Sequence, residues 1–498
     1  MSLEFIEPEK HRQLFFDDSA LETAGAVQNH GWKRTMHPPV KCGPVIRPDV
    51  LQGQRSLQSR SVPQWNSEKE IWEWWYFGDN VRYATSTDGE NWEKPALGLY
   101  EWNGSKENNI ADNPVGSERQ CLTHVIRDEL DDDPQRRYKG LFTRRAVVNA
   151  SNRFPAVSPD GFDWTILDVP PIPSSDEAHF TYDEVGSQYI AMVKHGTEWG
   201  RSVFLSTSKD FEHFSEPELI FHSDEIDHEN CRRRVREVIE NPAYITPPVV
   251  DDVDYIAEVY QMAVMPYEGC YFGFPVLFNP FGAQPPPQMN FTRINQVELA
   301  FSRDLRHWDR VGDRMPFVGI DPWDGVNYGT SQNLLCGRPI VRADLDEIFV
   351  YYNALRIPGS KELYEVFNRN RELFRLNVDP EILDDGGALS LAKLRIDGFV
   401  SLDVEEAGTI TTKPFMLNGE DVYLNYEAKW GAVYPEIVDG ETLKRFPGGF
   451  TVIGEPLSGD STRAKIKWDS QGHGLAFEKP VRIIFDLHLA RLYSFWLE

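Results

Sequence analysis

The chain has 498 residues and a formal net charge of −27, and 12% of its residues are aromatic. A surface this acidic disfavours nucleic acid and anionic membranes as partners, because like charges repel. The length favours two domains over one, and the abundance of Trp, Tyr and Phe is typical of a β-rich protein.

The cysteines and the first residues bear on the cellular compartment. Five Cys are scattered along the chain without a Cys-x-x-Cys pair, so a zinc–thiolate site is not expected. Free thiols fit a reducing compartment, which predicts a cytoplasmic location. No apolar run reaches the length of a membrane helix, and the opening MSLEFIEPEK lacks the apolar core of a signal peptide. A periplasmic or secreted location stays open if a signal peptide has been removed.

A short motif recurs four times along the first two thirds of the chain. Each copy has a strand-like run, then Ser-x-Asp, then an aromatic residue six positions after the Ser. Ser and Asp side chains bond the backbone of tight turns, and the alternating run before them is typical of a strand. Each copy therefore predicts a hairpin whose aromatic residue packs beneath the next strand. The copies span residues 83–95, 156–167, 205–217 and 299–311.

A fifth strand-rich stretch, residues 346–356, lacks the turn motif. Five units of about four strands each predict an all-β fold that closes radially, a five-bladed β-propeller over residues 1–365. Residues 366–387 are predicted to form a connector. Short alternating strands separated by turn residues over 388–498 predict a C-terminal antiparallel β-sandwich.

Five stretches carry a resemblance to a known group of enzymes. They are RQLFFDDSALE (12–22), HPPVKCGPVIRPD (37–49), YATSTDGENWEKP (83–95), DGFVSLD (397–403) and LYSFWLE (492–498). The predicted five-bladed propeller with a C-terminal β-sandwich resembles glycoside hydrolases of the invertase and arabinanase type, and these stretches are similar to a bacterial branch of that group. The resemblance covers nearly the whole chain. It implies hydrolysis of a glycosidic bond at the end of an oligo- or polysaccharide, so a carbohydrate is the expected partner.

The same resemblance implies three carboxylates at the tops of the inner strands of blades one to three. One carboxyl group protonates the leaving oxygen, one attacks or activates water, and one steadies the positive charge of the transition state. Here the first two positions hold Arg60 and His124, and only the third holds acids, Asp176 and Glu177. Glu177 is therefore the expected general acid, with Asp18 or Asp176 as the nucleophile or base.

Other acids stand as candidates for the missing positions. Asp17 and Asp18 lie in an apolar strand, where a buried acid must be paired or carry a raised pKa; the alternative is an acidic turn capped by Asp18. Glu258 is a lone acid in the inner strand of blade four, beside Tyr260, and is equally well interpreted as a satisfied polar core residue. Asp324 is a further candidate in a loop at the mouth of the propeller.

Basic and aromatic residues are expected to converge on the same mouth. Guanidinium groups bind carboxylate or sulfate bidentately, which predicts an anionic sugar, uronic or sulfated. The alternative is that these groups pair with local acids such as Asp176, Glu177 and Glu198. Trp199 is expected to stack on a sugar ring. The expected substrate-binding residues are Arg60, His124, Arg144, Arg145, His179, His195, Trp199, Arg201, Glu258, Tyr260 and Asp324.

Two other functions stay open. A lyase of uronic sugars would use His124 or His179 with Tyr260 as base and acid. A non-catalytic carbohydrate-binding protein would explain why acids are missing from blades one and two. No cofactor is expected; a metal ion at the propeller axis, held by His124, His179 and His195, is an alternative that lacks a readable ligand spacing. The oligomeric state stays open.

Overall fold

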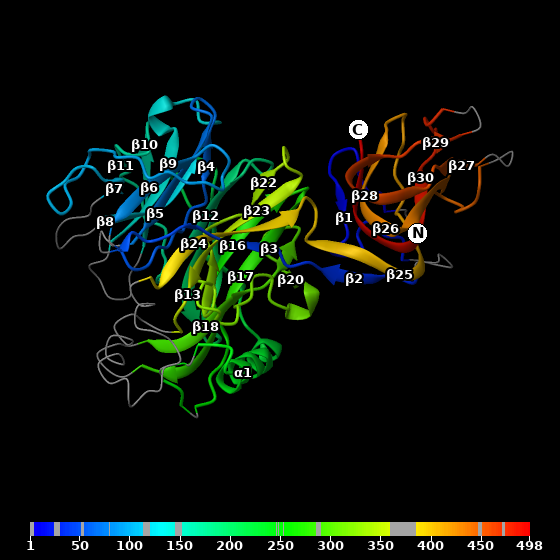
Figure 1. The fold of residues 1–498 in the computed structure, drawn as a ribbon. Coiled ribbons are helices and arrows are strands. Elements are labelled where there is room, and N and C mark those ends of the chain that lie inside the picture. The colour runs from blue at the N-terminus through cyan, green and yellow to red at the C-terminus, as the bar shows by residue number, and fades with distance from the viewer. Residues whose placement is uncertain are drawn as a thin grey trace.

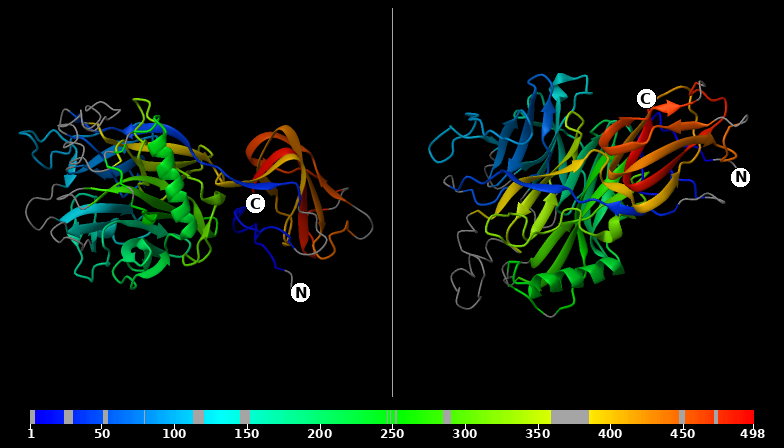
Figure 2. Two further views of the ribbon diagram at one scale, coloured as in Figure 1. Left: turned by 90° about the horizontal axis from the view of Figure 1, so that it is seen from below. Right: turned by 45° about the vertical axis from the view of Figure 1, so that its right-hand side comes forward.

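The computed structural model describes residues 4–23, 30–50, 54–78, 80–112, 120–144, 152–245, 247, 249–251, 253–284, 290–358, 385–446, 451–470 and 474–498. These residues form an all-β protein in two bodies, a propeller and a smaller sandwich (Figure 1, Figure 2). The described part holds one α-helix, α1 (Glu225–Glu240), which packs beside strand β17 (Cys270–Ala283) of the propeller. In those ranges no helix is long and apolar enough to cross a membrane.

The first three blades are separate four-stranded antiparallel sheets, in which neighbouring strands follow one another along the chain. Their strands are β4 (Gln64–Asn66), β5 (Ile71–Phe77), β6 (Val81–Ser86) and β7 (Ile110–Asp112); β8 (Gln120–Arg127), β9 (Tyr138–Arg144), β10 (Arg153–Ser158) and β11 (Thr165–Ile166); and β12 (Ala178–Asp183), β13 (Gln188–Thr197), β14 (Gly200–Ser208) and β15 (Glu218–Phe221).

The fourth and fifth blades share one ten-stranded sheet, because β18 and β21 meet in a parallel pair at Asn295 and Gln332. Strand β3, from the N-terminal part of the chain, pairs with β24 and completes the fifth blade, which closes the ring. Besides β17, the strands of this sheet are β16 (Glu258–Tyr267), β18 (Phe291–Val297), β19 (Ala300–Ser302), β20 (Asp309–Arg310), β21 (Gln332–Leu335), β22 (Ile340–Arg342), β23 (Glu347–Leu355), β24 (Gly387–Arg395) and β3 (Val40–Ile46).

The repeated turn motif folds as the sequence predicts. In the first copy, the hydroxyl of Ser86 accepts from the backbone N–H of Gly89 at 2.8 Å, and Asp88 accepts from two backbone N–H groups at 2.8 Å. The indole N–H of Trp92 then donates to the Gly89 carbonyl at 3.1 Å, and its ring packs against Trp74. The same bonds recur in the second copy, at Ser158, Asp160 and Trp164.

The sandwich is an eight-stranded antiparallel sheet that encloses its own apolar core. Its long strands bend at shifts of register. Two N-terminal strands join it, so the chain begins in the sandwich, builds the propeller and returns. The strands are β1 (Gln13–Leu14), β2 (Lys33–Met36), β25 (Val400–Thr411), β26 (Val422–Asp439), β27 (Val452–Gly454), β28 (Leu457–Lys465), β29 (Trp468–Asp469) and β30 (Val481–Leu497).

The domain boundaries differ from the expectation. Strand β24, which was expected to open the sandwich at residue 388, pairs with β23 and β3 in the propeller. Strands β1 and β2, expected in the propeller, pair with β30 and β25 of the sandwich. Most of the expected connector, residues 366–387, lies outside the described residues.

One buried carboxylate joins the two bodies. Asp397 lies in the turn between β24 and β25, is 1% exposed, and has a φ of 60°. Arg12 donates to it at 2.8 Å and Ser494 of β30 at 2.7 Å, and Tyr267 of β16 also donates to it. Asp397 therefore holds groups from the N-terminal segment, the propeller and the sandwich.

Candidate active site

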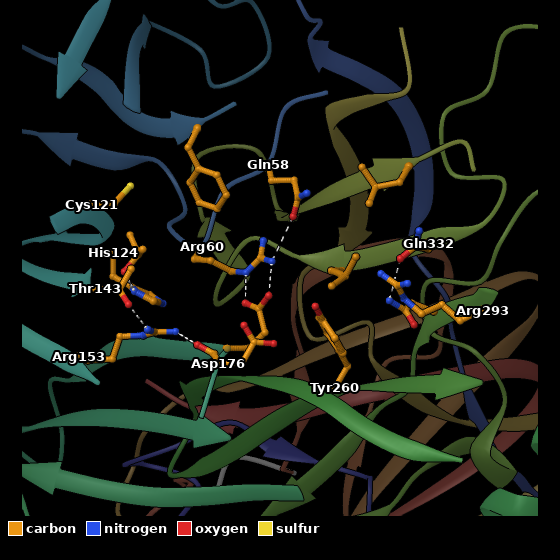
Figure 3. A pocket seen from close by; sticks show the side chains of 16 residues that line it. Gln58, Arg60, Cys121, His124, Thr143, Arg153, Asp176, Tyr260, Arg293 and Gln332 are labelled. Carbon is orange, nitrogen blue, oxygen red and sulfur yellow. Dashed lines mark hydrogen bonds and ion pairs between the residues drawn. The ribbon is translucent and has the colours of Figure 1, made fainter. Parts of the chain in front are cut away.

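A cavity of about 340 Å³ lies where the first strands of the five blades meet (Figure 3). Each blade contributes to its lining through its first strand or the segment just before that strand, because ring closure brings these segments together. Five of the residues expected from the sequence line this cavity. They are Arg60, His124, Asp176, Glu177 and Tyr260.

Arg60 and Glu177 form a buried, bidentate ion pair in this cavity. Nη2 of Arg60 donates to Oε1 of Glu177 at 2.7 Å, and Nε donates to Oε2; the residues are 6% and 9% exposed. Burial alone would raise the pKa of Glu177, but the charge and hydrogen bonds of Arg60 outweigh burial and lower that pKa below its usual range. Glu177 therefore stays ionised at neutral pH. The expected role of general acid does not fit it, because a general acid must carry a proton.

Asp176 lies next to Glu177 on the open side of the cavity. Its side chain is 57% exposed, and its Oδ2 accepts from Nζ of the buried Lys194 at 2.6 Å. Its backbone carbonyl accepts from the guanidinium of Arg153, which also donates to Thr143 at 3.0 Å (Figure 3). The site thus presents one accessible carboxylate and one clamped carboxylate, each beside its own cation.

Tyr260 and Arg293 form the opposite wall. Burial, reinforced by the charge of Glu177, raises the pKa of Tyr260, so its phenol keeps its proton. The Tyr260 ring stacks on Phe278 with 5.8 Å between centroids, and the Arg293 guanidinium lies 5.3 Å from the same ring. Arg293 donates to the carbonyl of Phe291 at 2.9 Å, but it forms no ion pair with an acid of the described residues. Burial lowers the pKa of Arg293.

His124 lines the cavity, but both of its ring nitrogens are engaged. Nε2 donates to the carbonyl of Ala178 at 2.8 Å, and Nδ1 lies 2.8 Å from the hydroxyl oxygen of Thr123. Burial, together with the charge of Arg153, lowers the pKa of His124 well below its usual value, so the ring is neutral. His124 therefore does not fit the base that a lyase would need.

His179 and His195 do not line the cavity. His179 is buried, and neither ring nitrogen has a hydrogen-bond partner among the described residues. Burial lowers the pKa of His179 to about 3. His195 lies 3.2 Å from the hydroxyl of Ser175 and packs edge-on against Phe204. Across the part of the chain that the structure describes, no three His, Cys, Asp or Glu side chains are placed together to hold a metal ion.

Asp17 and Asp18, expected in the site, lie away from this cavity. Asp17 pairs with Arg303 at 3.0 Å and accepts from the backbone N–H of Ser19 at 2.9 Å. Asp18 pairs at 2.5 Å with Arg34, which belongs to β2 of the sandwich. Strand β1, just before these acids, pairs with β30, so the segment follows the sandwich. The acidic-turn alternative describes these residues better than a catalytic role does, although Asp17, and not the expected Asp18, caps the turn.

Four expected binding residues also lie outside the cavity lining. Arg201 of β14, in the third blade, pairs at 2.5 Å with Glu258 of β16, in the fourth blade. Trp199 stacks on His222 with 4.0 Å between ring centroids. Asp324 accepts from two backbone N–H groups of its own exposed turn. These four residues are engaged by contacts outside the shared cavity and do not line it.

Three bases that the sequence analysis did not name complete the site, namely Arg153, Lys194 and Arg293. Each is the only Lys, Arg, Asp or Glu in its strand, β10, β13 or β18. A lone charge in a strand of a β-rich core needs a partner, and this pattern could have pointed to them. Of the other expected bases, Arg144 ends β9, but its side chain and the whole of Arg145 lie outside the described residues.

No protein-family profile and no curated protein matches the chain. Among solved structures, an N-acetylgalactosamine deacetylase from F. plautii is 13% identical with a TM-score of 0.41, over 74% of this chain and 96% of that one. A β-fructofuranosidase of glycoside hydrolase family 32 from Bombyx mori is 9% identical with a TM-score of 0.39, over 93% and 94%. An exo-β-1,3-galactanase from Phanerochaete chrysosporium is 10% identical with a TM-score of 0.33, over 89% and 96%. Likenesses at this level carry no information about activity.

Proposed function

We propose that the protein is a glycoside hydrolase that acts on the end of an oligosaccharide or polysaccharide bearing an anionic sugar. The supporting observation is that two adjacent carboxylates, Asp176 and Glu177, face one cavity at the centre of the propeller. Hydrolysis of a glycosidic bond needs two carboxyl groups beside that bond. A cavity of about 340 Å³ is near the small end of ligand pockets, which favours the end of a chain over its middle.

Asp176 and Glu177 lie in different environments, and we assign them different catalytic roles on that basis. Glu177, held ionised by Arg60, faces the positive charge that develops at the anomeric carbon, as nucleophile or electrostatic stabiliser. Asp176 is open to solvent, so it takes the proton that the attacking water gives up and passes that proton to the leaving oxygen. The bond from the anomeric carbon to the leaving oxygen breaks, and water supplies the hydroxyl to that carbon. The neutral phenol of Tyr260 donates a hydrogen bond to the bound sugar.

Arg293 supports the anionic character of the sugar. The charges of Arg60 and Lys194 are balanced by Glu177 and Asp176, whereas Arg293 has no acid partner among the residues that the structure describes. A guanidinium withdrawn from water without a counter-charge is costly. A sugar carboxylate or sulfate would supply that charge and match the fork of the guanidinium bidentately.

A panel of 4-nitrophenyl glycosides tests this function, with glucuronide, galacturonide and sulfated sugars beside their neutral counterparts. The wild type should release nitrophenol from an anionic glycoside. Glu177→Gln and Asp176→Asn should each lower kcat/KM by roughly 100-fold or more. Asp18→Asn is the matched control, because it neutralises an acid outside the cavity and should keep full activity. Equal rates for wild type and Glu177→Gln would refute the proposal.

A non-catalytic carbohydrate-binding protein is the second candidate. The Arg60–Glu177 pair favours it, because both oxygens of this carboxylate are already bonded. Titration calorimetry with uronic and sulfated oligosaccharides, followed by analysis of the recovered sugars, separates the two functions. Binding without any new reducing end would support the binding protein and contradict the hydrolase.

A further inference from the structure

Trp430 is the most exposed large apolar side chain of the described residues, at 89%. It lies in β26, a strand that Figure 1 shows in the sandwich, and it does not line the cavity of the propeller. An indole this exposed buries almost no apolar surface, so it contributes little to the stability of its own domain. Packing therefore does not account for a Trp at this position.

The backbone around Trp430 is shaped to display it. Residues 428–431 of β26 lie opposite only two residues of β30, so β26 bulges outward here. The bulge needs Gly431, because a Cβ at this position would lie 1.7 Å from the carbonyl oxygen of His488. Across the bulge, Leu489 has a φ of 47°, an uncommon conformation for a branched side chain. Bulges re-aim side chains, and backbone strain of this kind concentrates at binding sites.

A groove of about 350 Å³ opens beside the indole. Four of its five charged residues form ion pairs: Arg491 lies 3.2 Å from Asp403, and Lys429 lies 3.2 Å from Glu427. These pairs hold several donors and acceptors in place around one flat apolar face. We name this surface, with Trp430 at its edge, the Trp430 groove.

We propose that the Trp430 groove binds a neutral oligosaccharide. One face of a pyranose ring carries C–H groups and can cover an indole, while the hydroxyls at its rim need both donors and acceptors. The groove has three acids and two bases, so it lacks the surplus of positive charge that an anionic glycan would require. The acids are Asp403, Glu405 and Glu427, and the bases are Lys429 and Arg491.

A second copy of this chain is a poorer occupant of the groove. Cores of protein interfaces are depleted in charged residues, whereas five of the nine residues that line the groove are charged. A protein surface laid over them would strip water from the ion pairs, which is costly. A sugar leaves the outer side of each pair wet. The Trp430 groove shares no lining residue with the central cavity, so binding there is independent of the proposed hydrolase activity.

Affinity gel electrophoresis in soluble neutral polysaccharides, namely β-1,3-glucan, arabinan and galactomannan, tests the proposal. The wild type should be retarded by at least one of them, and Trp430→Ala should bind that polysaccharide roughly tenfold more weakly. Trp430→Phe should recover part of the affinity, because it restores an aromatic face. Trp65→Ala is the matched control, because it removes an indole that is 40% exposed on the propeller, and it should migrate like the wild type.

Three outcomes would overturn the proposal. The first is equal migration of wild type and Trp430→Ala in every gel. The second is retardation that Glu177→Gln abolishes and Trp430→Ala does not, which would place the binding in the central cavity. The third is a wild-type dimer in sedimentation velocity that Trp430→Ala abolishes, without retardation by any polysaccharide. An unchanged melting temperature for Trp430→Ala would show that loss of binding is not loss of fold.

Discussion

Arg60 and Glu177 lie 117 positions apart in the chain, yet one guanidinium bonds both oxygens of one carboxylate. Arg60 precedes the first strand of the first blade, and Glu177 precedes the first strand of the third. The pair can therefore form only when the ring is closed. It ties the charge state of the cavity to the integrity of the propeller.

Replacing Arg60 by Met should destabilise the protein by about 3–5 kcal/mol, because Glu177 would stay buried without its partner. Urea unfolding at neutral pH measures the change. The double variant Arg60→Met/Glu177→Gln should recover most of that loss, because neither charge is then left alone. A single variant as stable as the wild type, or a double variant less stable than the single one, would contradict this account.

His179 should make the stability depend on pH. Burial lowers its pKa to about 3 from an ordinary value of 6.5. Between these values the unfolded chain binds a proton that the folded chain does not, so the free energy of unfolding falls as the pH drops through this window. The contributed slope approaches about 1.4 kcal/mol per pH unit. Above pH 6.5 the ring is neutral in both states, so His179 no longer makes the free energy of unfolding depend on pH.

The variant His179→Leu isolates this effect. It should flatten the acid side of the stability profile without loss of stability at neutral pH, because neither ring nitrogen has a hydrogen-bond partner among the described residues. Urea unfolding at several pH values between 3 and 6.5 supplies the two slopes. Parallel slopes for wild type and variant would show that His179 takes up its proton in the folded state as well.

Much of the fold could be predicted because its signals are local. Ser86, Asp88 and Trp92 make their turn with bonds that span only a few positions, so the motif can be interpreted without knowing the rest of the ring. Its recurrence marks the blades, and the blades in turn place Arg60 and Glu177 near the axis. These steps need no knowledge of long-range contacts.

The parts of the fold and the site that the sequence does not predict depend on contacts between distant segments. Asp17 and Asp18 were expected in the cavity because their stretch resembles a buried strand, but the strand before them pairs with β30 at the other end of the chain. No local pattern indicates that pairing. Arg293 is recognisable in the sequence as the lone charge of its strand, but its lack of an acid partner among the described residues shows only in the closed ring.

Asp397→Asn should destabilise the protein by about 2–4 kcal/mol, because the buried carboxylate that binds Arg12, Tyr267 and Ser494 loses its charge. Asn tolerates the positive φ of this position, so the variant changes the charge and leaves the backbone unstrained. Urea unfolding, followed by Trp fluorescence, measures the loss. The control is Asp324→Asn, in an exposed turn, which should lower the free energy of unfolding far less. Equal losses for the two variants would show that Asp397 does not stabilise the junction of the two bodies.

Arg293 and Arg201 offer a matched comparison, because both lie over the ring of Phe278, at 5.3 Å and 4.4 Å. Only Arg201 has an acid partner among the described residues, Glu258 at 2.5 Å. Arg293→Met should therefore leave the free energy of unfolding unchanged or raise it. Arg201→Met should lower that free energy by about 1–3 kcal/mol, because Glu258 loses its partner. The reverse order of stability would mean that Arg293 is the structural cation of the two.

The two variants should rank in the opposite order when kcat/KM on the proposed anionic substrate is compared: Arg293→Met should lose more activity than Arg201→Met. Arg293→Met removes the cation that faces the anionic group, and a charged hydrogen bond of this kind corresponds to roughly 10- to 100-fold in kcat/KM. A neutral glycoside with the same leaving group should lose little, because it presents no charge to Arg293. Arg201→Met should affect both substrates alike, since Arg201 does not line the cavity. Kinetics of both variants on the paired glycosides decide the matter, and equal losses on the charged and neutral substrates would show that Arg293 does not recognise the charge of the sugar.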